Sequence, residues 1–161
     1  MVRKTVALAL VIAFASMAPS FAGEGHEDMM KQMMNCSVCS KMMPHLAELG
    51  PVMKAEIVEL NNGMAMIHTI TDAKKVDTYH TVSEMMQEAG NECMAYTDAQ
   101  AKEKMCGHCN EIRSAVKSGA NFSIGLTEHG DMMVLTSDDP ELQKKIDSIQ
   151  KNFEMILAAS R

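Results

Sequence analysis

The chain has few aromatic residues and few basic ones. Tryptophan is absent, and only four phenylalanines and two tyrosines occur among the 161 residues. Aromatic platforms on which bases or sugars stack are therefore not expected. Lysine and arginine number 15 against 21 aspartates and glutamates, which gives a formal net charge of −6. An acidic surface is repelled by phosphate backbones, so the composition argues against a nucleic-acid partner.

Long hydrophobic runs are also missing. The apolar stretch at residues 6–15 is too short to span a bilayer, which takes about 20 residues. It follows the basic pair Arg3 and Lys4 and precedes a small-x-small sequence that ends at Ala22, the layout of a secretory signal peptide. This predicts cleavage after Ala22 and a periplasmic or secreted protein with no membrane-spanning segment. The alternative is a cytosolic protein with a buried N-terminal helix.

Sulfur, by contrast, is abundant. The chain has 18 methionines and five cysteines, and all five cysteines follow the predicted cleavage site. In an oxidising compartment an odd number of cysteines leaves at least one thiol free, bound to a metal or shared with a partner.

The sequence contains an internal repeat at a shift of 67 residues. With Gly63 placed over Gly130, the flanking segments agree in their pattern of apolar and polar positions. The matched pairs are Ile57 with Ile124, Met66 with Met133, Ile67 with Val134, Thr69 with Thr136, Asp72 with Asp139, Tyr79 with Ile146, Val82 with Ile149 and Met86 with Phe153. Upstream, two Cys-x-x-Cys pairs correspond at a shift of 70. We interpret the chain as two copies of one unit.

Each copy predicts the same order of elements. A helix follows each cysteine pair, two strands joined by a glycine-containing turn come next, and a helix with apolar residues at i, i+3 and i+7 closes the unit. The predicted elements are helices at 39–49 and 109–118, strands at 54–60, 64–70, 122–128 and 132–136, and closing helices at 73–88 and 139–157. Gly90 is expected to end the first closing helix, and Thr97 to cap a short helix.

The predicted fold class is α+β, built of two tandem α-β-β-α units. A two-stranded hairpin is marginally stable alone, so we expect the two hairpins to share a four-stranded antiparallel sheet covered by helices. The predicted organisation is a signal peptide at 1–22, a first repeat at 23–90 with Cys36 and Cys39, a linker helix at 91–104, and a second repeat at 105–161 with Cys106 and Cys109.

The two cysteine pairs are the main candidates for chemistry. Cys36 and Cys39 enclose Ser-Val, and Cys106 and Cys109 enclose Gly-His, each pair near the start of a predicted helix. The free N–H groups and the dipole of a helix start favour thiolate over thiol, and two thiolates three residues apart can converge on one soft cation. Thioethers and thiolates select copper(I). The first pair is surrounded by methionines at positions 29, 30, 33, 34, 42 and 43.

Met34 stands two residues before Cys36, which makes the motif Met-x-Cys-x-x-Cys. The motif and the helix, two strands and helix behind it resemble the heavy-metal-associated domain of copper chaperones and metal-pumping ATPases. In each copy the resemblance covers the motif and about 50 residues behind it. It implies a ferredoxin-like arrangement in which copper(I) or a similar ion is held by Cys36 and Cys39, and by Cys106 and Cys109.

The same cysteines leave other chemistry open. Covalent haem attachment requires histidine directly after the second cysteine, and Ser40 and Asn110 stand there instead. A thiol–disulfide oxidoreductase uses a Cys-x-x-Cys pair at a helix start. The pairs are also compatible with structural disulfides in a module that binds a partner. A tetrahedral zinc site made from all four cysteines would require the two loops to meet in space.

Met34 and His108 are the secondary ligand candidates, His108 because it lies inside the second pair. Cys93, between the copies, is a candidate for a disulfide, for a third sulfur ligand to one pair or for a link to a partner chain, and we favour a disulfide or a small buried residue. No Ser-His-Asp order, phosphate-binding loop or acid pair supports enzyme activity. The sequence therefore predicts a periplasmic buffer or chaperone for a soft metal, copper(I) or zinc, whose Met-rich helix offers a surface to another envelope protein.

Overall fold

The computed structural model describes residues 24–159, so the predicted signal peptide lies outside the described residues. The helices and strands, in chain order, are α1 (Glu24–Asn35), α2 (Leu46–Leu49), β1 (Met53–Leu60), β2 (Gly63–Ile70), α3 (Val76–Cys93), α4 (Asp98–Lys104), α5 (Gly107–Lys117), β3 (Asn121–Thr127), β4 (Gly130–Thr136) and α6 (Pro140–Ala159).

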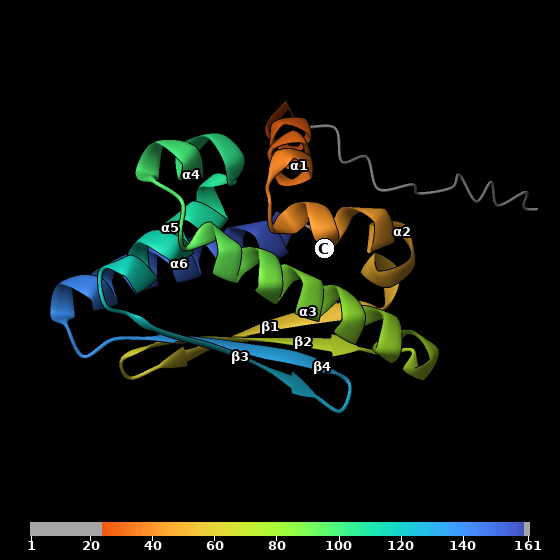
Figure 1. Cartoon of the computed structure of the whole chain (residues 1–161). Helices are drawn as coiled ribbons and strands as arrows, with labels where there is room; N and C mark the ends of the chain where they lie inside the picture. Colours follow the sequence, from red (N-terminus) through yellow and green to blue (C-terminus); the bar gives the residue numbers. More distant parts are fainter. Residues whose placement is uncertain (1–23, 160–161) are drawn as a thin grey trace, which may run out of the picture.

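The four strands form one antiparallel sheet in the order β1-β2-β4-β3. The α+β class and the shared four-stranded sheet are therefore confirmed. The two hairpins meet through β2 and β4, where Met66 pairs with Met133. The helices lie on one side of the sheet, with α3 and α6 nearest to it and α1 and α4 farthest away (Figure 1).

The core lies between the sheet and these helices. Side chains of a strand alternate between its two faces, so every second residue of β2 and β4 points at the helices. The larger core, against α5 and α6, contains Met64, Met66, Ala115, Ala120, Met133, Leu135, Ile146 and Ile149. A second core, against α2 and α3, contains Leu49, Ile70, Val76, Tyr79 and Val82. The aligned stripe residues thus fill corresponding positions in the two cores.

The predicted helix at 39–49 is broken. Residues Cys39–Lys41 and Met43–His45 form separate 3-10 turns, and α2 adds only four residues. Pro44 accounts for the break, because proline has no N–H to donate and its ring clashes with the preceding turn. The helix α5, which contains no proline, is continuous to Lys117, and Gly119 follows it with φ of 107°.

Two other helix boundaries differ from the prediction. Gly90 does not end α3, which continues to Cys93, because the cost of one glycine in a helix, about 1 kcal/mol, is smaller than the gain from packing the last turn. The helix predicted over 91–104 is consequently shorter, and α4 begins only at Asp98. Thr97 caps it as predicted, in a reciprocal capping box with Gln100.

A buried carboxylate fastens α3 to the sheet. Asp131 of β4 lies 2.8 Å from Nδ1 of His68 and accepts a hydrogen bond of 2.6 Å from Oγ of Ser83 on α3. Burial raises the pKa of Asp131, but the hydrogen bonds from His68 and Ser83 outweigh burial and hold the pKa below its ordinary value. The partners of this carboxylate therefore stabilise its charged form inside the fold.

Gly63 and Gly130 are required where β2 and β4 approach each other. A Cβ at Gly63 would lie 2.1 Å from the carbonyl oxygen of Leu135, and one at Gly130 would lie 2.0 Å from that of His68. Both obstacles are backbone atoms, which cannot rotate away. No non-glycine residue in the described part of the chain has a positive φ. Close backbone approach therefore requires glycine at both positions, and at Gly63 the φ of 158° adds to this requirement.

We expect Gly63→Ala and Gly130→Ala each to destabilise the fold by about 1–3 kcal/mol or more, because a methyl group would push the central strands apart. Gly90→Ala is the matched control: nothing lies within 4 Å of its Cβ position, so it should stabilise α3 by roughly 0.5–1 kcal/mol. Urea unfolding measures the free energy of unfolding of all three variants, provided that the m-value is the same as in the wild type. A wild-type midpoint for Gly130→Ala would contradict this account of the sheet.

Candidate metal centre

The structure brings the four paired cysteines to one point, which we call the sulfur site: Cys36, Cys39, Cys106 and Cys109. Their four Sγ atoms all lie within 4.8 Å of one another. Sγ of Cys39 lies 3.4 Å from that of Cys109 and 3.7 Å from that of Cys106. A regular tetrahedron of sulfurs around zinc, with bonds of about 2.3 Å, has edges of about 3.8 Å. The spacing is therefore suited to a single four-coordinate ion, and the two loops do meet in space.

The two cysteine loops are built alike. In the first, the backbone N–H of Ser40 donates to the carbonyl of Cys36 over 3.0 Å, and in the second, the N–H of Asn110 donates to the carbonyl of Cys106 over the same distance. Cys106 is the N-cap of α5, so Cys109 lies in the first turn of that helix. In both loops the first cysteine is buried and the second is half-buried.

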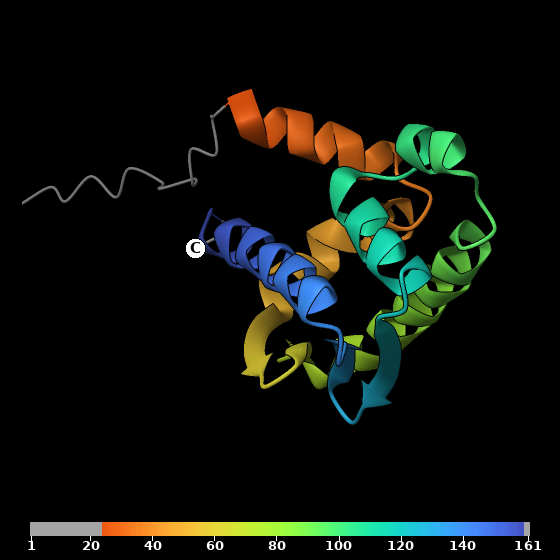
Figure 2. The ribbon, with the colours of Figure 1, turned by 90° about the vertical axis from the view of Figure 1, so that its left-hand side faces the viewer.

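A direct backbone contact holds the two loops together. The N–H of Ser37 donates to the carbonyl of Lys104 over 2.8 Å, and Oγ of Ser37 donates to the same oxygen over 3.1 Å. Ser37 lies inside the first cysteine pair and Lys104 ends α4, just before the second pair. The segment after α1 and the start of α5 accordingly lie side by side (Figure 2).

The sulfur site has an apolar wall. Cys36 is 1% exposed and Cys106 is 7% exposed, and they pack with Cys93, Ala101 and Met105. Val38 and Tyr96 are partly buried against this cluster. Low polarity around the sulfurs strengthens every electrostatic interaction there, including the attraction of thiolates for a cation.

Contact between the sulfurs changes how they hold protons. Hydrogen bonding to Cys106 lowers the pKa of Cys36 and raises the pKa of Cys39 and of Cys109, and hydrogen bonding to Cys109 lowers the pKa of Cys106. These contacts favour the thiolate at Cys36 and Cys106 and the protonated thiol at Cys39 and Cys109. Four adjacent negative charges repel one another strongly, so a cation is needed before all four sulfurs can ionise.

Arg113 of α5 holds the chain segment next to the sulfur site in place, and no sequence pattern predicted this role. This side chain is buried: Nε donates to the carbonyl of Cys93 over 3.0 Å, one terminal nitrogen donates to the carbonyl of Tyr96, and the other lies 3.2 Å from a carboxylate oxygen of Asp98. It ties the segment between α3 and α4 to the helix that carries Cys109. The only feature of the sequence that links Arg113 to the site is its position four residues after Cys109. Helical periodicity alone predicts that an arginine at this position is exposed.

The two secondary candidates, Met34 and His108, differ in their surroundings. Met34 is on α1 with 54% of its surface exposed. The ring of His108 packs edge-on against Phe153 of α6 at a centroid distance of 3.7 Å, and its Nε2 is buried without a hydrogen-bond partner in the described part of the chain. No nitrogen of His108 belongs to the group of four close sulfurs.

All five cysteines are free thiols. Cys93, at the end of α3, is buried next to the sulfur site but does not belong to its group of four. Burial raises the pKa of Cys93, which favours a neutral thiol. Of the two roles expected for it, the structure places Cys93 as a small buried residue.

No family model, no curated protein and no solved structure matches the chain. The resemblance to heavy-metal-associated domains therefore stays a prediction. Among the described residues, no helix combines the length and the apolar character needed to cross a membrane.

We expect Arg113→Leu to destabilise the metal-free protein by about 2–4 kcal/mol, because the buried carbonyls of Cys93 and Tyr96 would lose their donor. Asp98→Ala removes the other end of the same ion pair, but the Asp98 side chain is 91% exposed, so its loss should cost less than about 1 kcal/mol. Thermal and urea unfolding compare the two variants. Equal, small effects would show that Arg113 does not support this region.

Proposed function

We propose that this chain is a metal-binding protein of the cell envelope that holds one soft ion between Cys36, Cys39, Cys106 and Cys109. The convergence of four sulfurs from two separate loops carries the proposal. Without a cation, the four sulfurs either keep protons or repel one another as thiolates. A bound cation allows all four to be thiolates at once. The envelope location depends on the predicted signal peptide at residues 1–22.

Copper(I) and zinc are the two ions to consider. The spacing of the four sulfurs favours zinc, which takes four thiolates in a tetrahedron. The methionines of α1 favour copper(I), since thioether sulfur selects that ion. Met30 and Met33 are half-buried on α1, directly before the first cysteine of the site. Both ions are consistent with a buffer or a chaperone, because Cys39 and Cys109 are half-buried and remain open to ligand exchange.

We further propose that the chain is a tandem duplication of an α-β-β-α unit, and that the duplication creates the site. The hairpin registers agree at the shift of 67: Leu60 pairs with Gly63 as Thr127 pairs with Gly130. Contacts between the hairpins agree as well, since Ser137 N–H donates to Asn62 and Ile70 N–H donates to His129. Two equivalent units related in this way supply two equivalent Cys-x-x-Cys loops to one centre.

A thiol–disulfide oxidoreductase is the second candidate function, favoured by the 3.4 Å between the half-buried sulfurs of Cys39 and Cys109. Joining them would form one S–S bond, release two protons and pass two electrons to a disulfide of a partner, which would be reduced to two thiols. The apolar, four-sulfur surroundings favour the metal over this reaction, because a redox pair needs only two of the four cysteines.

The protein purified anaerobically from the periplasm should contain one soft metal ion per chain by elemental analysis. Cys36→Ser and Cys106→Ser should each weaken metal binding by more than about 100-fold, since each removes one of four ligands. Cys93→Ser is the matched control: it alters a buried cysteine beside the site and should keep one ion per chain.

Metal retained unchanged in both ligand variants would contradict the proposed function. A metal-free wild-type protein that catalytically reduces or oxidises a model disulfide would establish the oxidoreductase instead.

We expect metal uptake to release protons and the apparent affinity to fall as the pH falls. The metal-free sulfur site holds protons on Cys39 and Cys109, whose pKa values are raised, and these protons compete with the ion. Calorimetric titration in buffers of different ionisation enthalpy, at one pH, counts the protons released. Binding without proton release would show that the four sulfurs do not share protons as described.

A further inference from the structure

A groove of about 380 Å³ leads to the sulfur site from the surface. It lies between α1, α4 and the start of α5, and Cys106 is the cysteine that lines it. Its volume is within the range of pockets that accept small molecules. Cys106, which is 7% exposed in all, is therefore the member of the sulfur site that this groove contacts.

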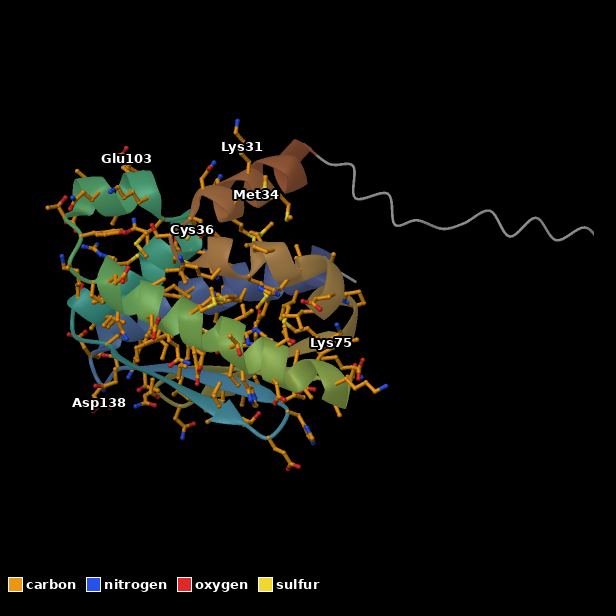
Figure 3. The ribbon with its side chains drawn as sticks, turned by 45° about the vertical axis from the view of Figure 1, so that its right-hand side comes forward. Lys31, Met34, Cys36, Lys75, Glu103 and Asp138 are labelled. Carbon is orange, nitrogen blue, oxygen red and sulfur yellow. The ribbon has the colours of Figure 1, made fainter. Side chains whose placement is uncertain are left out.

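The charge of the groove is opposite to that of the chain. Lys31 of α1 and Lys102 of α4 line it, against a single acidic residue, Glu103. Among the side chains that the structure describes, those of residues 30–155 and 157, none pairs ionically with Lys31, Lys102 or Glu103. In Figure 3, Lys31 and Glu103 stand at the top of the molecule above Cys36. Two free ammonium groups in an otherwise acidic protein attract an anion and repel a hydrated metal cation.

We propose that this groove binds a small anionic thiol, through which metal is exchanged with the sulfur site. The proposal rests on the proposed function. The thiolate of the carrier enters between Lys31 and Lys102 and bonds to the metal as the metal–sulfur bond of Cys106 breaks. One metal–sulfur bond forms as another breaks, Cys106 leaves as a thiolate, and no electron is transferred. Loading is the reverse, in which Cys106 displaces the carrier thiolate.

The test compares two small thiols of opposite charge acting on the cobalt(II)-loaded protein. Mercaptosuccinate carries two carboxylates and cysteamine carries an ammonium group. The change in the cobalt–thiolate absorption spectrum in anaerobic stopped flow reports the exchange rate. The double variant Lys31→Glu with Lys102→Glu should slow exchange with mercaptosuccinate about tenfold at low ionic strength, and the difference should shrink as salt screens the charges. Exchange with cysteamine should not slow.

The control is Lys54→Glu with Lys74→Glu, which makes the same change in net charge at two exposed lysines of β1 and of the turn before α3. It should exchange like the wild type. The neutral variant Lys31→Gln with Lys102→Gln should slow exchange with mercaptosuccinate to a smaller extent. It also provides a test if the Lys31→Glu and Lys102→Glu double variant does not fold. Equal slowing by the control, or equal effects on both thiols, would overturn the proposal. A wild-type protein that takes up no cobalt(II) would instead contradict the proposed function.

Discussion

The mutual repulsion of four neighbouring sulfurs is the constraint around which this molecule is arranged. Thiolates that lie within 4.8 Å of one another cannot all carry charge unless protons or a cation lie between them. The apolar residues Cys93, Ala101 and Tyr96 beside the sulfurs strengthen this repulsion, because charges interact more strongly in surroundings of low polarity. A single soft cation bound among the four thiolates removes this repulsion. The geometry of the sulfurs is therefore the main support for the proposed function.

The rest of the fold holds the two loops at that distance. The central pairing of β2 with β4 sets one hairpin against the other, and the glycines at positions 63 and 130 permit this pairing by leaving room for the opposite backbone. Above the sheet, the bonds from Ser37 to Lys104 and from Arg113 to the segment after α3 fix the loops. The sulfur site is thus supported by the pairing of the strands and by hydrogen bonds from Ser37 and Arg113 to backbone carbonyls.

The site is held firmly but is not sealed. Cys36 and Cys106 are buried, whereas Cys39 and Cys109 are half-buried and a groove reaches Cys106. A purely structural metal site is closed on all sides. Partial access suits a protein that releases its ion to another ligand, which agrees with a buffer or a chaperone and with the lysines that line the groove.

The sequence by itself determined the strands, the helix that closes each hairpin and the four cysteines, because alternation, helical periodicity and Cys-x-x-Cys spacing are local. It did not reveal that Pro44 breaks the first helix, since a proline may also begin one, or that α3 runs past Gly90, where packing outweighs propensity. Only the tertiary structure decided that the two cysteine pairs share one centre and that Arg113 is buried behind it. Those facts depend on contacts between residues about 70 positions apart, whose distance no local pattern records.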